Sequence, residues 1–298
     1  MVVRIENVTK RFGNRTVLRD IDLHIPSHSI YGFVGANGAG KTTLMKCMLG
    51  LLPLNQGTIT VAGERVTFGE TPSNQYIGYL PDVPEFYPFY TAQQYLELCA
   101  VITGMPRKEQ KPRIDELLTL VGLADTSSSI STYSRGMKQR LGIAQALLNR
   151  PKLLICDEPT SALDPAGRAQ ILSILQKAKE ETTVFFSTHI LSDAEQICDH
   201  VAMLHEGKII FQDDLRTLQQ QFQDQFIYRF TIPVQQAKNR LQHTAFQMEC
   251  SDDELIVYLP NDTQRLAFMT ELTKNALIME SMHPQASQLE QLVLEVLR

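Results

Sequence analysis

The chain has 298 residues, of which 43% are hydrophobic, a length and composition that suit two domains or one large α/β domain with an appendage. The formal net charge of −5, without a basic block, argues against nucleic-acid binding and electrostatic attachment to anionic lipid. Five cysteines without a CxxC pair suit a reducing compartment, and no apolar stretch approaches the roughly 20 residues that cross a bilayer, so we expect a soluble, cytoplasmic protein.

Short β runs separated by turn signals fill the first eighty residues. They are rich in β-branched residues and cover residues 2–6, 17–25, 30–34, 58–61 and 77–80. This order predicts a β-rich N-terminal subdomain that precedes an α/β core.

The apolar run 30–34 leads directly into a sequence that fits the phosphate-binding pattern GxxxxGKS/T. Its glycines allow positive φ and close backbone approach, so that successive N–H groups can point at the phosphates of a nucleotide. Lys41 is expected to reach the β- and γ-phosphates, while the Thr42 hydroxyl binds Mg²⁺ at the positive start of a helix. The predicted nucleotide-binding residues of this loop are Gly35, Ala36, Asn37, Gly38, Ala39, Gly40, Lys41, Thr42 and Thr43.

Helical periods replace the β pattern between residues 91 and 149. Thr91 is the expected N-cap of the first helix, and apolar residues then recur at helical spacing through 95–102, 114–121 and 141–148. We interpret the stretch from about residue 86 to 150 as a helical insertion.

Strand character returns at residues 152–156, 183–187 and 201–204. The first two runs, separated by a helix-like segment, are expected to form parallel strands that are buried on both faces. Asp157 and Glu158 follow the first run, where a buried strand delivers charge to the edge of the sheet. Asp157 is predicted to hold Mg²⁺ through water, and Glu158 to polarise the water that attacks the γ-phosphate.

Further along the chain, the residue types at 205–208 predict a hairpin turn after the strand 201–204.

The pattern restarts after a glutamine-rich stretch. Strands are expected at 226–232, 245–250, 255–259 and 277–282, with helices at 234–241 and 263–273. This βαββαβ order is typical of a ferredoxin-like domain, here closed by a predicted helix at 287–297. The expected division is therefore a nucleotide-binding domain at 1–213, a linker at 214–225 and a small α+β accessory domain at 226–298.

Further motifs accompany the phosphate loop in a fixed order: Ser134-Arg135-Gly136, then the Asp157-Glu158 pair, then residues 161–164, then a histidine after a strand. Over about its first 210 residues the chain therefore resembles the ATP-binding subunit of an ABC transporter, a P-loop NTPase. The resemblance implies that Ser134 and Gly136 belong to the signature motif, that Asp164 closes the D-loop, that His189 is the switch histidine and that Phe12 stacks on adenine.

The same resemblance implies a mechanism. Two ATP-binding subunits, expected here as a homodimer, would face each other head to tail, with each ATP held between the phosphate loop of one and the signature motif of the other. Ser134, Arg135, Gly136 and Asp164 would then face the partner's nucleotide. The hydrolysis of Mg·ATP would drive separate membrane permease subunits, so we expect a peripheral location on the inner face of the cell membrane.

Two positions depart from the commonest family pattern. Asp82 stands where the Q-loop usually has glutamine, and it either reaches Mg²⁺ through water or is a turn residue beside Pro81. Arg135 stands where the signature usually has glycine, and it either turns toward its own helical subdomain or lies near the γ-phosphate in the closed dimer.

These departures and the C-terminal domain resemble ABC-2 type bacterial exporters of the bacitracin- and daunorubicin-resistance kind, which handle antibiotics, peptides, lipids or polysaccharides. An importer ATPase differs only in its partner. A soluble ABC ATPase acting on ribosomes or DNA is disfavoured by the single set of motifs and the negative charge. The aromatic segment 84–90 either receives the permease or packs in the core.

Overall fold

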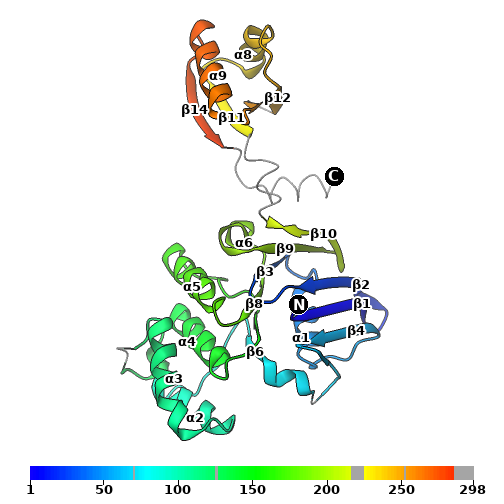
Figure 1. Ribbon diagram of the computed structural model, residues 1–298, viewed down its shortest axis with the longest axis vertical. Helices are drawn as coiled ribbons and strands as arrows, with labels where there is room; N and C mark the ends of the chain where they lie inside the picture. The colour runs from blue at the N-terminus through cyan, green and yellow to red at the C-terminus, as the bar shows by residue number, and fades with distance from the viewer. Residues whose placement is uncertain (70, 125–126, 216–224, 252, 285–298) are drawn as a thin grey trace. The chain divides into compact units, whose positions relative to one another are not determined.

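The structure is a computed structural model that describes residues 1–69, 71–124, 127–215, 225–251 and 253–284. The chain divides into two compact units, Met1–Asp213 and Asp214–Arg298. Each unit has sheets and apolar cores of its own, as the ribbon shows (Figure 1). The predicted helix 287–297 and residues 216–224 of the predicted linker lie outside the described residues.

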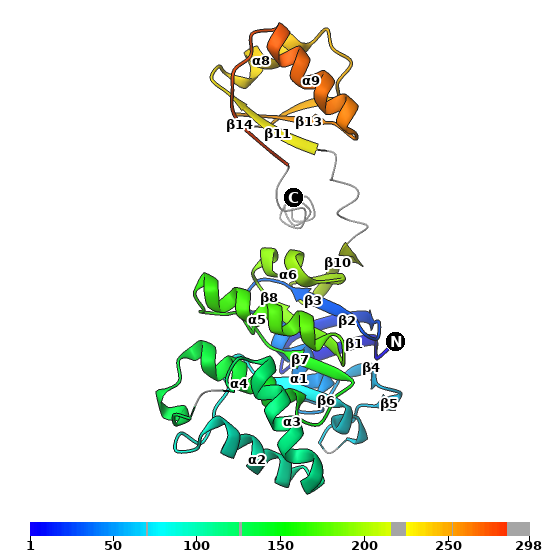
Figure 2. The ribbon, with the colours of Figure 1, turned by 60° about the vertical axis from the view of Figure 1, so that its left-hand side comes forward.

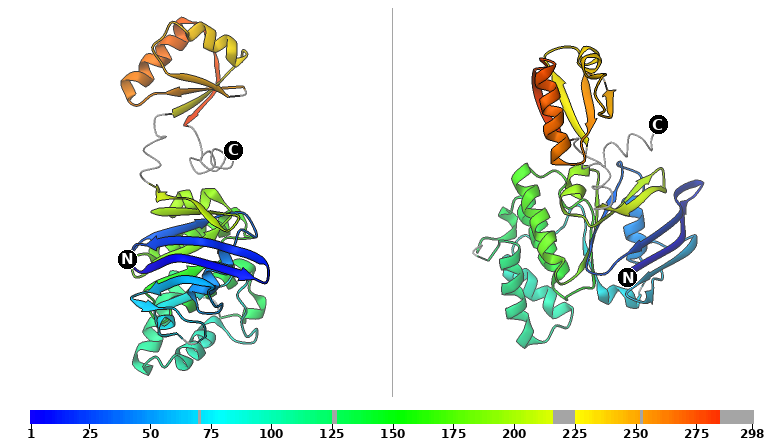
Figure 3. Two further views of the ribbon diagram at one scale, coloured as in Figure 1. Left: turned by 90° about the vertical axis from the view of Figure 1, so that its right-hand side faces the viewer. Right: turned by 45° about the horizontal axis from the view of Figure 1, so that its top comes forward.

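An antiparallel sheet opens the first unit. Its strand order is β2-β1-β4-β5, and it appears in blue on the near side of the left view in Figure 3. The pairing of β1 with β2 contains register shifts, so the long first strand follows a bent path and carries Phe12 at its end. The strands are β1 (Val3–Phe12), β2 (Arg15–Ile25), β4 (Gln56–Val61) and β5 (Glu64–Arg65).

The second sheet has six strands in the order β10-β9-β3-β8-β7-β6. Parallel pairing joins β9 to β3, β3 to β8, β8 to β7 and β7 to β6. The carboxyl ends of these strands therefore meet at one edge, where ligands bind in open α/β sheets. The strands are β3 (Ile30–Val34), β6 (Ile77–Leu80), β7 (Leu153–Cys156), β8 (Thr183–Thr188), β9 (His200–His205) and β10 (Lys208–Asp214).

Helices cover the parallel sheet, and α2, α3 and α4 gather into one helical group (Figure 2). The first of these starts as the sequence predicts, since Thr91 Oγ1 accepts from Gln94 N (3.2 Å) and Gln94 Oε1 accepts from Thr91 N (3.0 Å) in a capping box. The helices are α1 (Lys41–Met48), α2 (Ala92–Ile102), α3 (Arg107–Leu120), α4 (Arg135–Leu147), α5 (Pro165–Ala178) and α6 (Leu191–Ile197), with 3₁₀ turns at Pro72–Tyr76 and Ile130–Thr132.

The parallel sheet is buried on both faces. Leu154 and Phe186 pack in the core that also holds residues of α2 to α5. Their chain neighbours Ile155 and Phe185 point the other way, into the core shared with α1 and the antiparallel sheet. The prediction that these apolar runs form parallel strands with two buried faces is confirmed.

The second unit has the βαββαβ order that the sequence predicts. Its four strands pair antiparallel in the order β12-β13-β11-β14, which is the ferredoxin-like arrangement, and two helices lie on one face of the sheet (Figure 2). Its elements are β11 (Gln225–Phe230), α8 (Val234–Leu241), β12 (Met248–Ser251), β13 (Glu254–Tyr258), α9 (Asp262–Lys274) and β14 (Met279–Pro284).

None of the helices in the described part of the chain is long and apolar enough to cross a membrane.

We expect the two units to unfold in separate transitions, because their apolar cores contain different residues. Phe268 is fully buried in the second unit, with ring centroids 4.9 Å from Tyr228 and 5.1 Å from Phe246. Phe268→Ala should lower the free energy of unfolding of that unit by about 3–5 kcal/mol. Calorimetry should show one transition moving; the matched variant Leu175→Ala should move only the other. A common shift of both transitions would contradict independent folding.

Candidate nucleotide-binding site

The loop between β3 and α1 is shaped by its glycines in two different ways. Gly38 and Gly40 adopt positive φ values of 82° and 118°, which glycine tolerates without strain. Gly35 does not adopt a positive φ, and of the two properties expected of these glycines it uses the close backbone approach. A Cβ at Gly35 would lie 2.4 Å from the carbonyl oxygen of Leu204 in β9, so close backbone packing requires glycine at this position.

Lys41 begins α1 and is folded back over its own loop. Its side chain is only 5% exposed, and Nζ donates to the carbonyl oxygens of Gly35 (2.6 Å) and Ala36 (3.2 Å). The same ammonium lies 3.0 Å from Glu158 Oε1, in an ion pair whose geometry does not give a directed hydrogen bond. The positive end of α1 and this ammonium together favour an anion at the loop.

Asp157 and Glu158 follow β7 at the carboxyl edge of the parallel sheet. Asp157 is 3% exposed, and its backbone N–H donates to Leu80 O (2.8 Å). Glu158 has a φ of 49°, an uncommon conformation for a residue with a Cβ. Its Oε2 lies 2.8 Å from His189 Nδ1, so the turn aims the carboxylate at the loop after β8.

A cavity of about 350 Å³ brings most of the predicted catalytic and metal residues together. Its walls come from the loop before α1, the start of α1 and the loops after β6, β7 and β8. The predicted residues that line it are Asn37, Gly38, Gly40, Lys41, Thr42, Thr43, Asp82, Asp157, Glu158 and His189, and Val17 and Ser161 complete it. Residues from Val17 to His189, 172 positions apart in the chain, thus form one polar chamber.

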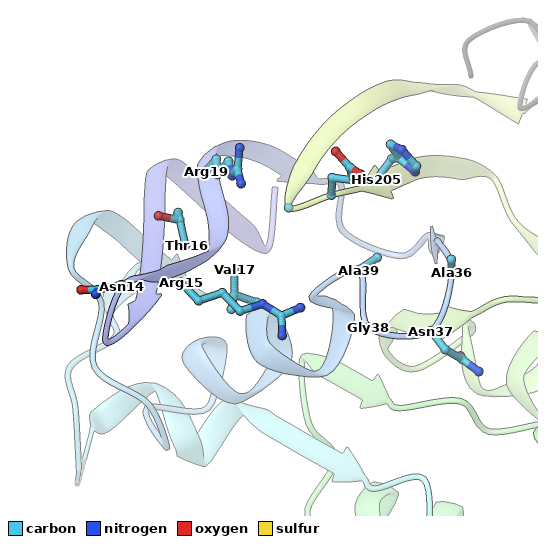
Figure 4. A pocket seen from close by; sticks show the side chains of 12 residues that line it. Asn14, Arg15, Thr16, Val17, Arg19, Ala36, Asn37, Gly38, Ala39 and His205 are labelled. Carbon is cyan, nitrogen blue, oxygen red and sulfur yellow. The ribbon is translucent and has the colours of Figure 1, made fainter. Parts of the chain in front are cut away.

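A second cavity of about 760 Å³ shares Val17, Asn37 and Gly38 with the first (Figure 4). Sequence reasoning gave no nucleotide-binding role to seven of the residues that line it, which are Asn14, Arg15, Thr16, Arg19, His205, Glu206 and Gly207. Arg15 and Arg19, which follow Phe12 in the sequence, could have indicated an anion-binding surface here. Phe12 itself is 47% exposed at the end of β1, with Lys10 Nζ 4.7 Å from its ring centroid, and it does not line either cavity.

The residues expected to face a partner's nucleotide line neither cavity. Ser134 is the exposed N-cap of α4, and its Oγ accepts from Met137 N (3.2 Å). Asp164 caps α5 in the same way, with Oδ1 accepting from Gly167 N (3.0 Å). Gly136 would admit a Cβ with only an ordinary contact to Leu163, so the start of α4 is open on that side.

Asp82 and Arg135, the two residues that differ from the family pattern, contact each other. Arg135 NH2 lies 3.2 Å from Asp82 Oδ1, and Gln139 of the same helix donates from Nε2 to the Asp82 carbonyl oxygen (2.7 Å). Arg135 therefore turns toward Asp82 in the loop after β6 of its own chain, and not toward the helical subdomain that the first of the two expected orientations named. Asp82 also lines the smaller cavity, so one carboxylate faces both the signature helix and the predicted metal position.

A buried acid on α6 fixes the loop that follows Glu158. Asp193 is 2% exposed and accepts from Thr160 Oγ1 (2.6 Å) and from Arg168 NH2 of α5 (2.5 Å). A buried charge needs such partners, because an unpaired one is expensive. The sequence did not reveal this cluster, whose members lie up to 33 positions apart.

Comparison with known proteins gives consistent matches. A family model described as "ABC transporter" matches residues 18–161. The chain is 39% identical over 236 residues to an uncharacterized ABC transporter ATP-binding protein, YxlF, of Bacillus subtilis, covering 79% of this chain and 77% of that protein. It is 41% identical over 212 residues to the bacitracin transport ATP-binding protein BcrA of Bacillus licheniformis, covering 70% and 68%. A solved dimeric ATP-binding cassette, in a post-hydrolysis state with ADP and phosphate, superposes with a TM-score of 0.64 at 25% identity, covering 72% of this chain and 99% of that one.

The pair of Asp82 and Arg135 gives a prediction about protonation. Burial raises the pKa of Asp82 above its usual value, Arg135 opposes that rise, and Asp157 and Glu158 add to it. The folded chain therefore binds this proton more readily than the unfolded chain, so the stability contributed by Asp82 falls as pH rises from the ordinary carboxyl pKa through the folded one. Arg135→Ala should raise the pKa further, as carbon-13 NMR of the Asp82 carboxyl would measure.

The matched control for this titration is Arg150→Ala. Arg150 is also exposed, but it pairs with Glu116 and Glu181, so its removal should leave the Asp82 titration unchanged. An unchanged or lowered Asp82 pKa in Arg135→Ala would show that the ion pair does not form in solution.

Proposed function

Because the chain belongs to the ABC transporter family as an ATP-hydrolysing subunit, we propose that two copies close around two Mg·ATP and power a separate membrane permease. We assign the permease as an ABC-2 type exporter of antibiotic, peptide, lipid or polysaccharide. Residues 1–213 would form the ATP-binding domain, with a helical subdomain at about 86–150, and residues 226–298 an accessory domain after the linker 214–225.

The observation that carries this proposal is the chamber that joins the phosphate loop to three acids, Asp82, Asp157 and Glu158, and to His189. The loop amides, Lys41 and the start of α1 bind the phosphates. Glu158 accepts a proton from the attacking water, and His189 holds the Glu158 carboxylate through the bond to Oε2. Adenine would stack on Phe12, whose ring is half exposed.

The residues of the chamber fit Mg²⁺, an ion that usually takes one or two carboxylates, phosphate oxygens and several waters. The Thr42 hydroxyl and Asp157 would hold it, with Asp82 acting through water. Asp157 Oδ1 accepts from Ser187, which leaves Oδ2 for the ion or its water. Bound Mg²⁺ would neutralise charge that develops on the phosphates.

The position of the signature residues supports a dimer. Ser134, Arg135, Gly136 and Asp164 lie outside both cavities of their own chain, so a second chain would have to supply them to a γ-phosphate. The N-terminus of α4 presents free backbone N–H groups, and such a helix end favours an anion. The solved relative with ADP and phosphate is itself dimeric, which supports a dimer here.

An exposed aromatic group next to Asp82 supports a permease partner. Tyr87 and Phe89 are 56% and 70% exposed, whereas Phe86 packs edge-on against Tyr95 with centroids 5.1 Å apart. The segment was expected either to receive the permease or to pack in the core, and its residues divide between these roles. Phe86 packs in the core, and Tyr87 and Phe89 are available for docking. The bacitracin transport relative supports export over import.

A soluble ABC ATPase remains the second candidate. The net charge of −5 disfavours a nucleic-acid partner, and co-purification with a membrane subunit separates the two functions.

Glu158→Gln should abolish turnover, lowering kcat roughly 10²- to 10⁴-fold through loss of the general base. ATP binding should persist, and size-exclusion chromatography with ATP should show a trapped dimer. Glu180→Gln, an exposed acid after α5, is the control and should hydrolyse ATP at the wild-type rate. A wild-type rate in Glu158→Gln would refute the role of Glu158 as the base.

Lys41→Ala should weaken ATP binding by about 10- to 100-fold, since charged hydrogen bonds contribute about 1.5–3 kcal/mol. Titration with a fluorescent ATP analogue measures this. Lys46→Ala removes an exposed lysine from the same helix and should leave the affinity unchanged. Equal losses in both variants would mean that net charge, and not the position of Lys41, determines binding.

A further inference from the structure

Ser187 is a fully buried hydroxyl near the carboxyl end of β8 that contacts both acids of the site. Its Oγ donates to Asp157 Oδ1 (2.7 Å) and accepts from the backbone N–H of Glu158 (2.9 Å). One small side chain thus joins the carboxylate of one acid to the main chain of the other.

The strand register explains why the serine lies there. In β8 successive side chains alternate between the two faces of the sheet, and Phe185 faces the core that contains α1. Ser187, two residues on, faces the same side, where the phosphate loop lies. The next residue, Thr188, has a different partner, since its Oγ1 accepts from Ile190 N (2.9 Å).

Both bonds restrain groups that have little freedom to find other partners. Glu158 is in a left-handed conformation, and its N–H lies at a part-buried position. Asp157 is 3% exposed, so water does not easily replace the serine. An apolar residue at 187 would leave a buried acceptor and a part-buried donor without this partner, and an unsatisfied buried polar group costs more than a hydrogen bond contributes when made.

We propose that Ser187 is a positioning residue for ATP hydrolysis, which fixes the distance and direction between Asp157 and Glu158. It touches neither nucleotide nor metal in this scheme and acts only through the two acids. It binds Asp157 through Oδ1 only and holds the backbone turn at Glu158, and both acids line the smaller cavity. The inference deepens the proposed function and rests on it.

The central experiment is Ser187→Ala in the full chain. Small errors in the placement of reacting groups are costly, so kcat should fall roughly 10- to 100-fold while the KM for ATP changes less than about threefold. Thr183→Val is the matched control, because Thr183 is 2% exposed at the other end of β8 and its Oγ1 accepts from His28 N (2.9 Å). It should keep kcat within about twofold of wild type.

Two further measurements separate positioning from a general loss of structure. ATP affinity is measured with Mg²⁺ and with EDTA, and the gain in affinity that Mg²⁺ provides should shrink in Ser187→Ala but not in Thr183→Val. Ser187→Thr retains the hydroxyl and should recover most of kcat, and the thermal midpoints of all variants show whether each is folded.

The outcomes distinguish this inference from the proposed function. Wild-type kcat and a wild-type Mg²⁺ gain in folded Ser187→Ala, with Glu158→Gln inactive, would overturn the role of Ser187 alone. Equal losses in Ser187→Ala and Thr183→Val would also overturn it. A wild-type protein without ATPase activity would overturn both the inference and the proposed function.

Discussion

The parallel pairing of β3, β8 and β7 is the constraint on which the site depends. Each strand ends at the same edge of the sheet, and each is followed by a different part of the chemistry: the phosphate loop, His189, and the acids Asp157 and Glu158. A slip of one residue in any pair would turn the following side chains to the other face. The apolar residues on both faces of the sheet prevent that slip, so the packing of the core determines the geometry of the polar chamber.

Close contacts hold the loops beyond the strand ends. The backbone of Gly35 lies against β9, Ser187 bridges the two acids, and Asp193 anchors the segment after Glu158. These contacts join residues of the chain itself, so they fix the positions of the phosphate loop, the two acids and the segment after Glu158 relative to one another.

The sequence was sufficient to predict those features that depend on residues close together in the chain. The phosphate loop, the buried parallel strands and the βαββαβ order follow from glycine spacing and from apolar periods that a short window contains. The sequence was not sufficient to predict contacts between segments that are far apart in the chain. Arg135 and Asp82 are 53 positions apart, and Ser187 looks like an ordinary end of an apolar strand. The carbonyl that excludes a Cβ at Gly35 comes from residue 204, a contact that the glycine spacing does not identify.

The hairpin between β9 and β10 has a structural consequence. Its residues His205, Glu206 and Gly207 form a wall of the larger cavity, and Gly207 O accepts from Arg19 N (2.8 Å). The same β10 ends at Asp214, where the second unit begins. The strand that starts at the wall of the larger cavity is therefore also the last strand of the first unit. A substitution in this hairpin that changes the cavity wall acts on the same strand that leads to the boundary between the two units.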